Sequence, residues 1–159
     1  MSENPTLSEL FPLPKEVKKL KSFLGEWIVE GRLTFESDTF KVEGLWKFDQ
    51  AAKGWGVLAI LKMNIEGLGE YEEVDLVGFD PGSGLFHIFS VTNTAATHDH
   101  KGNWLDDKTL KVTYEVLQEG KKQKEEITIK FDHPNEWSIH EIDTINGKIT
   151  STMDVKLRK

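Results

Sequence analysis

The chain has 159 residues, of which 38% are hydrophobic and 30% are charged, a length typical of one globular domain and a composition that excludes an intrinsically disordered chain. The 27 Asp and Glu exceed the 20 Lys and Arg and give a formal net charge of −7, which argues against nucleic acids and anionic membrane surfaces as partners. The absence of cysteine excludes disulfides, thiol nucleophiles and Cys-ligated zinc, and no apolar run approaches the ~18 residues of a membrane-spanning helix.

The N-terminal part of the sequence predicts an irregular lead-in followed by one short helix. Residues 1–13 contain Pro5 and Pro12 and have neither the positively charged start nor the apolar segment of a signal peptide. We therefore expect a cytoplasmic location. From Pro14 the apolar residues recur at helical spacing until Gly25, and lysines occupy the other face. This pattern predicts a short amphipathic helix whose lysines face solvent.

Ten segments with the composition of β-strands follow Gly25. They are rich in β-branched and aromatic residues, and they span residues 26–36, 39–49, 54–65, 70–79, 84–94, 97–105, 109–117, 122–131, 136–143 and 147–157. The turns between them are too short for crossover helices, so each strand is expected to pair antiparallel with the next. A meander of ten strands exposes its edges unless it closes on itself. We therefore predict an all-β fold, a ten-stranded antiparallel up-and-down barrel that forms a single domain over residues 14–159 and can leave an interior cavity.

Two of the predicted strands depart from the simple alternation of inward apolar and outward polar residues. The segment around Leu58 and Ile60 is apolar on both sides, so its outer side needs a cover, which the short helix or a partner could provide. The segment 70–79 places Glu73 and Asp75 in phase with aromatic and apolar residues. We expect these two carboxylates to point outward, and the alternative is that they are polar groups of the cavity.

The tripeptide Gly25-Glu26-Trp27, directly after the predicted helix, resembles the signature that begins the first strand of lipocalins and their relatives, the calycins. In that superfamily the Trp closes one end of the barrel, and a basic residue of the last strand packs over it. The resemblance therefore implies that Gly25, Trp27 and Arg158 close the barrel.

Further residues resemble a bacterial lipocalin-like family whose function is not established. They include residues 78–81 and the pair Gly102-x-Trp104, and the resemblance extends over about residues 20–159. It implies a calycin barrel without a particular activity. The start of the first strand is also similar to that of haem-binding relatives of the nitrobindin type, which implies haem as a cofactor with His140 or His98 as its axial ligand.

The histidines are the sharpest candidates for chemistry. His98 and His100 share one face of a predicted strand, ~6.5–7 Å apart, a spacing that suits two imidazoles on one metal ion. A turn centred on residues 95–96 puts His87 on the same face but ~13 Å from His100. A metal site would therefore need a carboxylate or His140 from elsewhere in the barrel. The other interpretations are histidines that line the cavity as hydrogen-bonding groups and histidines exposed in loops.

These observations favour a binding protein whose apolar cavity holds a small hydrophobic or amphipathic molecule. Tryptophan side chains would line the cavity, and imidazole and phenol groups would orient the ligand. The alternative is that the tryptophans fill the barrel core. The expected ligand-binding residues are His87, His98, His100, Trp104, Tyr114 and Trp46. We expect a monomer or a homodimer.

The alternative is an enzyme on the same barrel with His98 or His100 as the general base, because imidazole titrates near neutral pH. No second catalytic partner is evident, and the sequence lacks a Gly-x-Ser-x-Gly elbow, a P-loop and a dinucleotide-binding fingerprint. Catalytic residues therefore stay unassigned. No metal site is assigned, and the cofactor is left open, with haem and a metal ion as the candidates.

Overall fold

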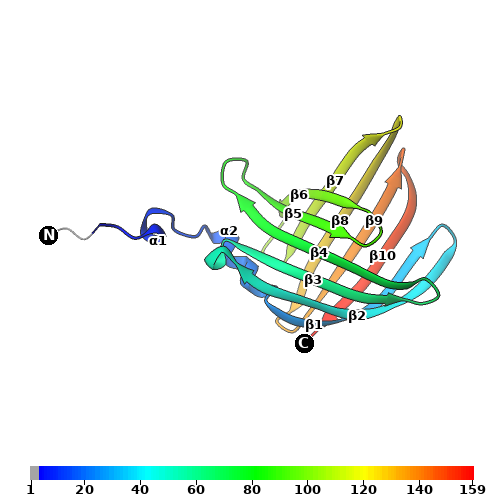
Figure 1. Cartoon of the computed structure of the whole chain (residues 1–159), viewed down its shortest axis with the longest axis horizontal. Helices are drawn as coiled ribbons and strands as arrows, with labels where there is room; N and C mark the ends of the chain where they lie inside the picture. Colours follow the sequence, from blue (N-terminus) through cyan, green and yellow to red (C-terminus); the bar gives the residue numbers. More distant parts are fainter. Residues whose placement is uncertain (1–3) are drawn as a thin grey trace.

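The computed structural model describes residues 4–159, and its strands form a closed antiparallel barrel (Figure 1). Each strand pairs with its neighbours in the sequence, and the last strand pairs with the first. The strands are β1 (Gly25–Phe35), β2 (Asp38–Ala51), β3 (Gly56–Ile65), β4 (Gly69–Asp80), β5 (Leu85–Thr92), β6 (Thr97–Trp104), β7 (Thr109–Gln118), β8 (Lys121–His133), β9 (Glu136–Ile145) and β10 (Lys148–Arg158). The predicted ten-stranded up-and-down barrel is confirmed, and the strand bounds differ from the expected ones by at most two residues.

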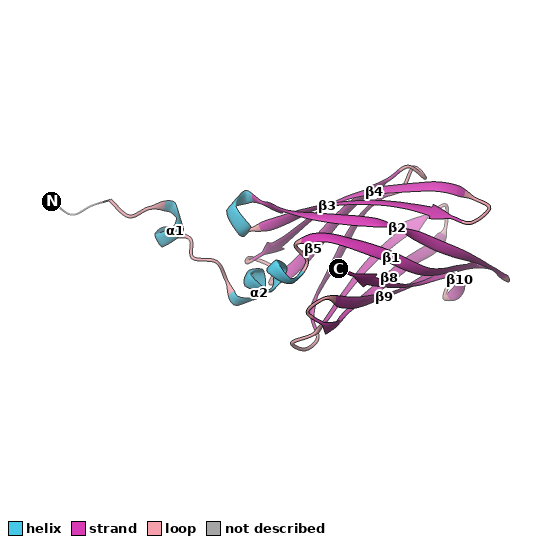
Figure 2. Ribbon diagram, turned by 90° about the horizontal axis from the view of Figure 1, so that it is seen from below, coloured by secondary structure: helices cyan, strands magenta, loops and turns pink. Residues whose placement is uncertain are grey.

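Short helical segments lie at one end of the barrel, which we call the helical end (Figure 2). They are α1 (Leu7–Leu10), α2 (Lys15–Lys18), the 3₁₀ helix η1 (Lys19–Ser22) and a 3₁₀ turn η2 (Ala52–Gly54) between β2 and β3. Together, α2 and η1 take the place of the predicted helix. The lead-in was expected to be irregular, and α1 is a helical turn within it, whereas residues 1–3 lie outside the described residues. Val17 and Leu20 are at most 2% exposed, so their segment packs into the barrel end.

Aromatic side chains fill the barrel interior at the helical end. Ring centroids lie 5.2–6.3 Å apart in a cluster of Phe23, Trp27, Trp46, Phe48 and Trp137. Trp27 and Trp137 are each 1% exposed. The space left among these rings and their neighbours is only about 40 Å³. This half of the barrel is therefore a packed core, held together by dense contacts between aromatic rings.

Trp27 is covered by a basic side chain, but that side chain belongs to Lys159. The Lys159 Nζ lies 4.4 Å from the centre of the Trp27 ring and donates a hydrogen bond of 2.9 Å to the Leu24 carbonyl. Gly25 has a φ of +116°, and a Cβ at this position would lie 3.1 Å from Lys159 Cε. Both the backbone angle and the approach of the lysine therefore favour glycine at this position.

Arg158, which the resemblance placed over Trp27, points outward instead. Its Nε lies 2.8 Å from Glu136 Oε2, and its Nη1 lies 3.8 Å from Glu30 Oε2. Strand alternation explains the difference, because Leu157 is fully buried and the next residue must face the other side. The expected role of Arg158 is therefore wrong, and the next basic residue along the chain takes the position over the ring.

The pairing of β5 with β6 differs from the prediction and moves His87 to the outer surface. His87 pairs with Lys101 rather than with Trp104, a shift of three residues. An odd shift exchanges the two faces of a strand. The loop spans residues 93–96 and is centred on Thr94 rather than on residues 95–96, since the Thr92 N–H bonds to the carbonyl of Ala96 and Ala95 takes a left-handed φ of +65°. His87 therefore does not share a face with the two histidines of β6.

The faces of β3 and β4 also differ from the expectation. Asp75 is 2% exposed and lies on the inward face of β4 with Glu73, while Val74 between them and Leu76 after them are exposed. Val77 follows Asp75 on the same face and packs in the core, so the alternation carries the carboxylates inward. The outward orientation expected for them is wrong. The helical segment covers the barrel end and leaves Leu58 on the outer side of β3 40% exposed.

Candidate functional site

A cavity of about 210 Å³ occupies the half of the barrel away from the helical end, and we call it the polar cavity. Its charged and titratable lining includes Glu73, His98, His100, Glu125, Glu141 and Asp143. Its apolar lining includes Leu33, Met63, Ile65 and Met153. Within residues 4–159 no Lys or Arg contributes to this lining. The cavity is therefore acidic, in contrast to the apolar cavity that the aromatic content led us to expect.

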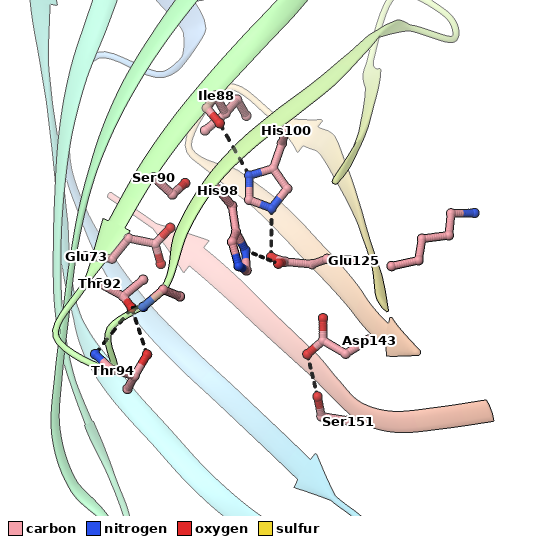
Figure 3. A network of polar contacts seen from close by, with 12 residues as sticks. Glu73, Ile88, Ser90, Thr92, Thr94, His98, His100, Glu125, Asp143 and Ser151 are labelled. Atoms are coloured by element: carbon pink, nitrogen blue, oxygen red, sulfur yellow. Dashed lines mark hydrogen bonds and ion pairs between the residues drawn. The ribbon is translucent and has the colours of Figure 1, made fainter. Parts of the chain in front are cut away.

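Glu125 of β8 joins both histidines of β6 (Figure 3). Its Oε2 lies 2.7 Å from His98 Nδ1, and its Oε1 lies 2.9 Å from His100 Nε2. Tyr114 of the intervening strand β7 pairs with Glu125 across the sheet. The Tyr114 ring stacks on His98 with a centroid distance of 4.1 Å and an interplanar angle of 11°. Three neighbouring strands thus supply one compact group, and the structure adds the carboxylate that the sequence interpretation lacked.

The orientation of His100 is fixed by its burial and by a backbone contact. The residue is 1% exposed, and its Nδ1 lies 3.3 Å from the Ile88 carbonyl oxygen. The Nδ1–H therefore donates to the backbone, and Nε2 faces Glu125. Burial disfavours the charged imidazole, but the close contact with the negative carboxylate of Glu125 outweighs this and raises the pKa of His100. Burial would likewise raise the pKa of Glu125, but the two imidazoles outweigh it and lower that pKa.

A second acidic group lies on β9 beside Glu125. Carboxylate oxygens of Glu125, Glu141 and Asp143 all lie within 4.8 Å of one another. Asp143 accepts a hydrogen bond from Ser151 of β10 (Figure 3). Burial and the charges of Glu125 and Asp143 hold the pKa of Glu141 well above its ordinary value, and burial and Glu125 raise that of Asp143. These carboxyl groups repel one another, and a bound cation would relieve the repulsion.

Two further carboxyl groups, those of Glu73 and Asp75 on β4, lie deeper in the barrel. The Tyr71 hydroxyl donates a 2.7 Å hydrogen bond to Glu73, and the Ser90 hydroxyl donates a 2.5 Å hydrogen bond to Asp75. Burial raises the pKa of Tyr71, and the charge of Glu73 raises it further. Burial and Glu73 also raise the pKa of Asp75 well above its ordinary value. Asp75 therefore keeps its proton to a higher pH in the folded protein than in the unfolded chain.

Replacing Asp75 with Asn is expected to stabilise the protein increasingly as the pH rises. The unfolded chain releases this proton near pH 3.8, whereas the folded state retains it. The unfolding free energy of the natural chain therefore falls above that pH, with a limiting slope of ~1.4 kcal/mol per pH unit from this group. Asn has no proton to lose and still accepts the Ser90 hydrogen bond. Urea unfolding at several pH values between about 4 and 7 measures the difference.

The control for this prediction is Asp49→Asn. Asp49 is exposed and forms a surface ion pair with Lys47 at 3.1 Å, so its replacement is expected to change stability by less than about 1 kcal/mol at any of these pH values. A stability gain for Asp75→Asn that is the same at every pH would contradict the burial of a carboxyl group with a raised pKa.

The structure brings three of the predicted ligand-binding residues together and separates the others. His98 and His100 line the polar cavity, and Tyr114 packs behind them. Trp46 instead belongs to the aromatic core at the helical end. Trp104 lies at the same end as Trp46, where its ring packs against aromatic neighbours and under a lysine of η1. The two tryptophans do not line the polar cavity.

The remaining histidine candidates lie on the outer surface. His87 Nδ1 lies 3.0 Å from Asp99, and His140 Nδ1 lies 2.6 Å from Asp154. His140 therefore cannot reach a group bound inside the barrel. His98 does face the interior, but the cavity of about 210 Å³ is below the ~300–1,000 Å³ of pockets that hold drug-sized ligands. These positions and this volume do not fit a haem.

Sequence reasoning missed the carboxylates of β8 and β9. Glu125 is in phase with Ile127 and Ile129, and Glu141 is in phase with Ile139. Extending the alternation by one step along each strand would have placed both carboxylates on the inner face. Their charge argued against placing them on the inner face, because isolated charges are rarely buried.

Comparisons with known proteins support the fold and nothing finer. No protein-family model and no curated protein matches the chain. The S-type phycobiliprotein lyase CPES from Guillardia theta is similar in structure, with a TM-score of 0.59 and 11% identity over 98% of this chain and 98% of that chain. A redesigned β-barrel, mFAP0, solved bound to DFHBI, gives a TM-score of 0.49 and 14% identity over 87% of this chain and 99% of that one. The likeness to the lyase supports the β-barrel fold, while membership of the calycins and of the bacterial lipocalin-like family stays a prediction.

The helices of residues 4–159 are all too short, or too polar, to span a lipid bilayer.

Proposed function

We propose that this protein binds a small amphipathic molecule with a positively charged group, such as a protonated amine, in the polar cavity. The observation that carries the proposal is the charge of the lining, which has four carboxyl groups and, in the described part of the chain, no Lys or Arg. The carboxyl group of Glu141 lies among others of the lining, with oxygens of Glu125, Glu141 and Asp143 within 4.8 Å of one another. A cationic ligand would relieve the repulsion among these groups and bond to them.

The shape of the cavity supports a ligand smaller than a typical drug. Its volume of about 210 Å³ lies below the usual range of ~300–1,000 Å³. Leu33, Met63, Ile65 and Met153 offer an apolar wall, which suits a short hydrocarbon part of the ligand. A purely hydrophobic ligand has less support, because the apolar half of the barrel leaves only about 40 Å³.

Calorimetric titration with three probes of one size tests the proposal. In the presence of EDTA, n-butylammonium is expected to bind, and n-butyrate is expected not to bind because the carboxylates repel it. n-Butanol measures the apolar contribution alone. Glu141→Gln is expected to weaken n-butylammonium binding on the order of tenfold to a hundredfold, which corresponds to a lost charge-assisted hydrogen bond of ~1.5–3 kcal/mol.

Glu126→Gln is the matched control for the charge at this place in the sheet. Glu126 follows Glu125 on β8 but faces outward, where it pairs with Lys111 and Lys124. Its replacement is expected to leave the amine affinity unchanged. Equal binding of n-butyrate and n-butylammonium, or equal losses in the two variants, would rule out recognition by the cavity carboxylates.

A further inference from the structure

We infer that His98, His100 and Glu125 form a binding site for one divalent transition-metal ion, with Zn²⁺ as the best match. The inference goes beyond the proposed amine binding and does not depend on it. One ligand atom from each of the three side chains lies within 4.8 Å of the others. Ligand atoms of a tetrahedral zinc site with bonds of ~2.0–2.2 Å are ~3.3–3.5 Å apart. The observed separations of 2.7 and 2.9 Å to Glu125 thus need only small side-chain rotations to admit the ion.

The donor set selects the kind of metal. Two imidazole nitrogens and one carboxylate oxygen suit zinc and its transition-metal neighbours, whereas Mg²⁺ and Ca²⁺ prefer oxygen ligands alone. Three protein ligands are also the usual number in zinc sites that keep a coordination position open for water or a small molecule. Here the open position would face the polar cavity, since all three side chains line it (Figure 3).

The two imidazoles are already oriented as metal ligands usually are. A metal-bound histidine commonly donates its other ring N–H to a backbone carbonyl, which fixes the tautomer and the ring direction. His100 makes this contact through Nδ1 to the Ile88 carbonyl at 3.3 Å. The His98 ring is held by its stack on Tyr114 at 4.1 Å. The fold therefore already holds both rings largely in place, which lowers the entropy lost when they bind an ion.

The inner nitrogen of His100 lacks a well-directed hydrogen bond. The residue is 1% exposed, so water has little access to its Nε2. Glu125 Oε1 lies 2.9 Å away but off the direction in which Nε2 would bond, and no other group among residues 4–159 bonds to this nitrogen. Buried polar atoms without partners are uncommon in folded proteins. An ion placed between Nε2 and the carboxylate would satisfy both.

The surroundings favour a cation and allow it to enter. Glu141 and Asp143 lie beside Glu125, with oxygens of the three within 4.8 Å, and add negative charge to the position. The side chain of His98 is 29% exposed, and the cavity reaches the β5–β6 loop at Thr94. A hydrated ion can therefore reach the site from the end of the barrel away from the helical end, which is an entry path that a buried metal site requires.

Metal titration of the purified full-length protein tests the inference. The protein is stripped with EDTA, dialysed, and titrated with ZnCl₂ in competition with a chromophoric chelator, and with CoCl₂ to record the visible absorption bands of bound cobalt. One ion per chain is expected. His98→Ala is expected to weaken zinc binding by at least about 100-fold, since even the loss of an outer hydrogen-bond partner costs ~10–100-fold. His98 is used because it is partly exposed, and circular dichroism establishes that the variant is folded.

His87→Ala is the matched control, since His87 lies on the adjacent strand, outside the barrel, and also contacts a carboxylate, Asp99, at 3.0 Å. It is expected to leave zinc binding and the cobalt spectrum unchanged. Absence of stoichiometric zinc uptake by the natural chain would overturn the inference, as would uptake that folded His98→Ala retains or that His87→Ala loses equally. Because the n-butylammonium titration is run in EDTA, its failure would count against the proposed function alone.

Discussion

Replacement of Gly102 by Ala is expected to destabilise the barrel by at least about 3 kcal/mol, at or above the usual range for overpacking a core. A Cβ on Gly102 would lie 1.9 Å from the Lys111 carbonyl oxygen and 2.7 Å from Val112 Cα. Both are backbone atoms of β7, with which Gly102 is paired, so they cannot rotate away as a side chain can. Urea unfolding followed by tryptophan fluorescence measures the loss. The lack of a side chain on Gly102 allows β6, which carries His98 and His100, to pack closely against β7.

Gly78→Ala provides the control for Gly102→Ala. Gly78 lies near the end of β4, where it pairs with Gly56 on one side and His87 on the other, and nothing lies within 4 Å of the position its Cβ would take. Its replacement is expected to change stability by less than about 1 kcal/mol, in the stabilising direction, because alanine restricts the unfolded chain. A Gly102→Ala variant as stable as Gly78→Ala would show that the two strands can separate without cost.

Replacement of Trp137 by Ala is expected to lower the unfolding free energy by ~3–5 kcal/mol, the usual cost of removing a buried aromatic side chain. Trp137 is 1% exposed and contacts the rings of Phe23, Trp27 and Phe131 at centroid distances of 5.2–5.4 Å. Its removal leaves a void in the part of the barrel where the remaining free space is smallest. Thermal unfolding by calorimetry measures the effect through the melting temperature.

Phe89→Ala is the control for Trp137→Ala, because it removes an aromatic side chain that is not part of the core. Phe89 lies on the outer face of β5 and is 47% exposed, so its replacement is expected to cost less than about 1 kcal/mol. Because Trp137 does not line the polar cavity, folded Trp137→Ala is also expected to retain the zinc affinity of the natural chain. Equal melting temperatures for the two variants would contradict a packed aromatic core.

The strand pattern of this protein could be predicted because it depends on residues that are close to one another in the sequence. Turn residues mark each connection, and alternation identifies the inward face of strands such as β1, where Trp27 and Val29 are buried, and β10, where Val155 and Leu157 are buried. Closure into a barrel follows from the absence of crossover connections. The resemblance of Gly25-Glu26-Trp27 to the calycin signature pointed to the same fold. It singled out Trp27, which is buried at the helical end, but not Lys159, which lies over its ring.

The candidate site could be predicted only in part, because it depends on contacts between distant strands. The period of two placed His98 and His100 on one face but left open whether that face is inward, and in the structure both residues line the polar cavity. The pairing of β5 with β6 depended on the conformation of one loop, and an odd error in register moved His87 to the wrong side. No local pattern could bring Glu125 to the histidines, since the contact follows from the order of strands β6, β7 and β8 in the sheet.

By itself, the sequence determined the number and order of strands, their antiparallel pairing and the presence of a barrel, because these depend on turn chemistry and on the alternation of neighbouring residues. Only the tertiary structure decided that the interior has a packed aromatic half and an acidic half. A carboxylate such as Glu73, Asp75 or Glu141 is costly to bury alone. Whether it points inward is therefore set by its position on a barrel wall next to imidazoles, hydroxyls and a cavity, and those neighbours come from strands far apart in the sequence.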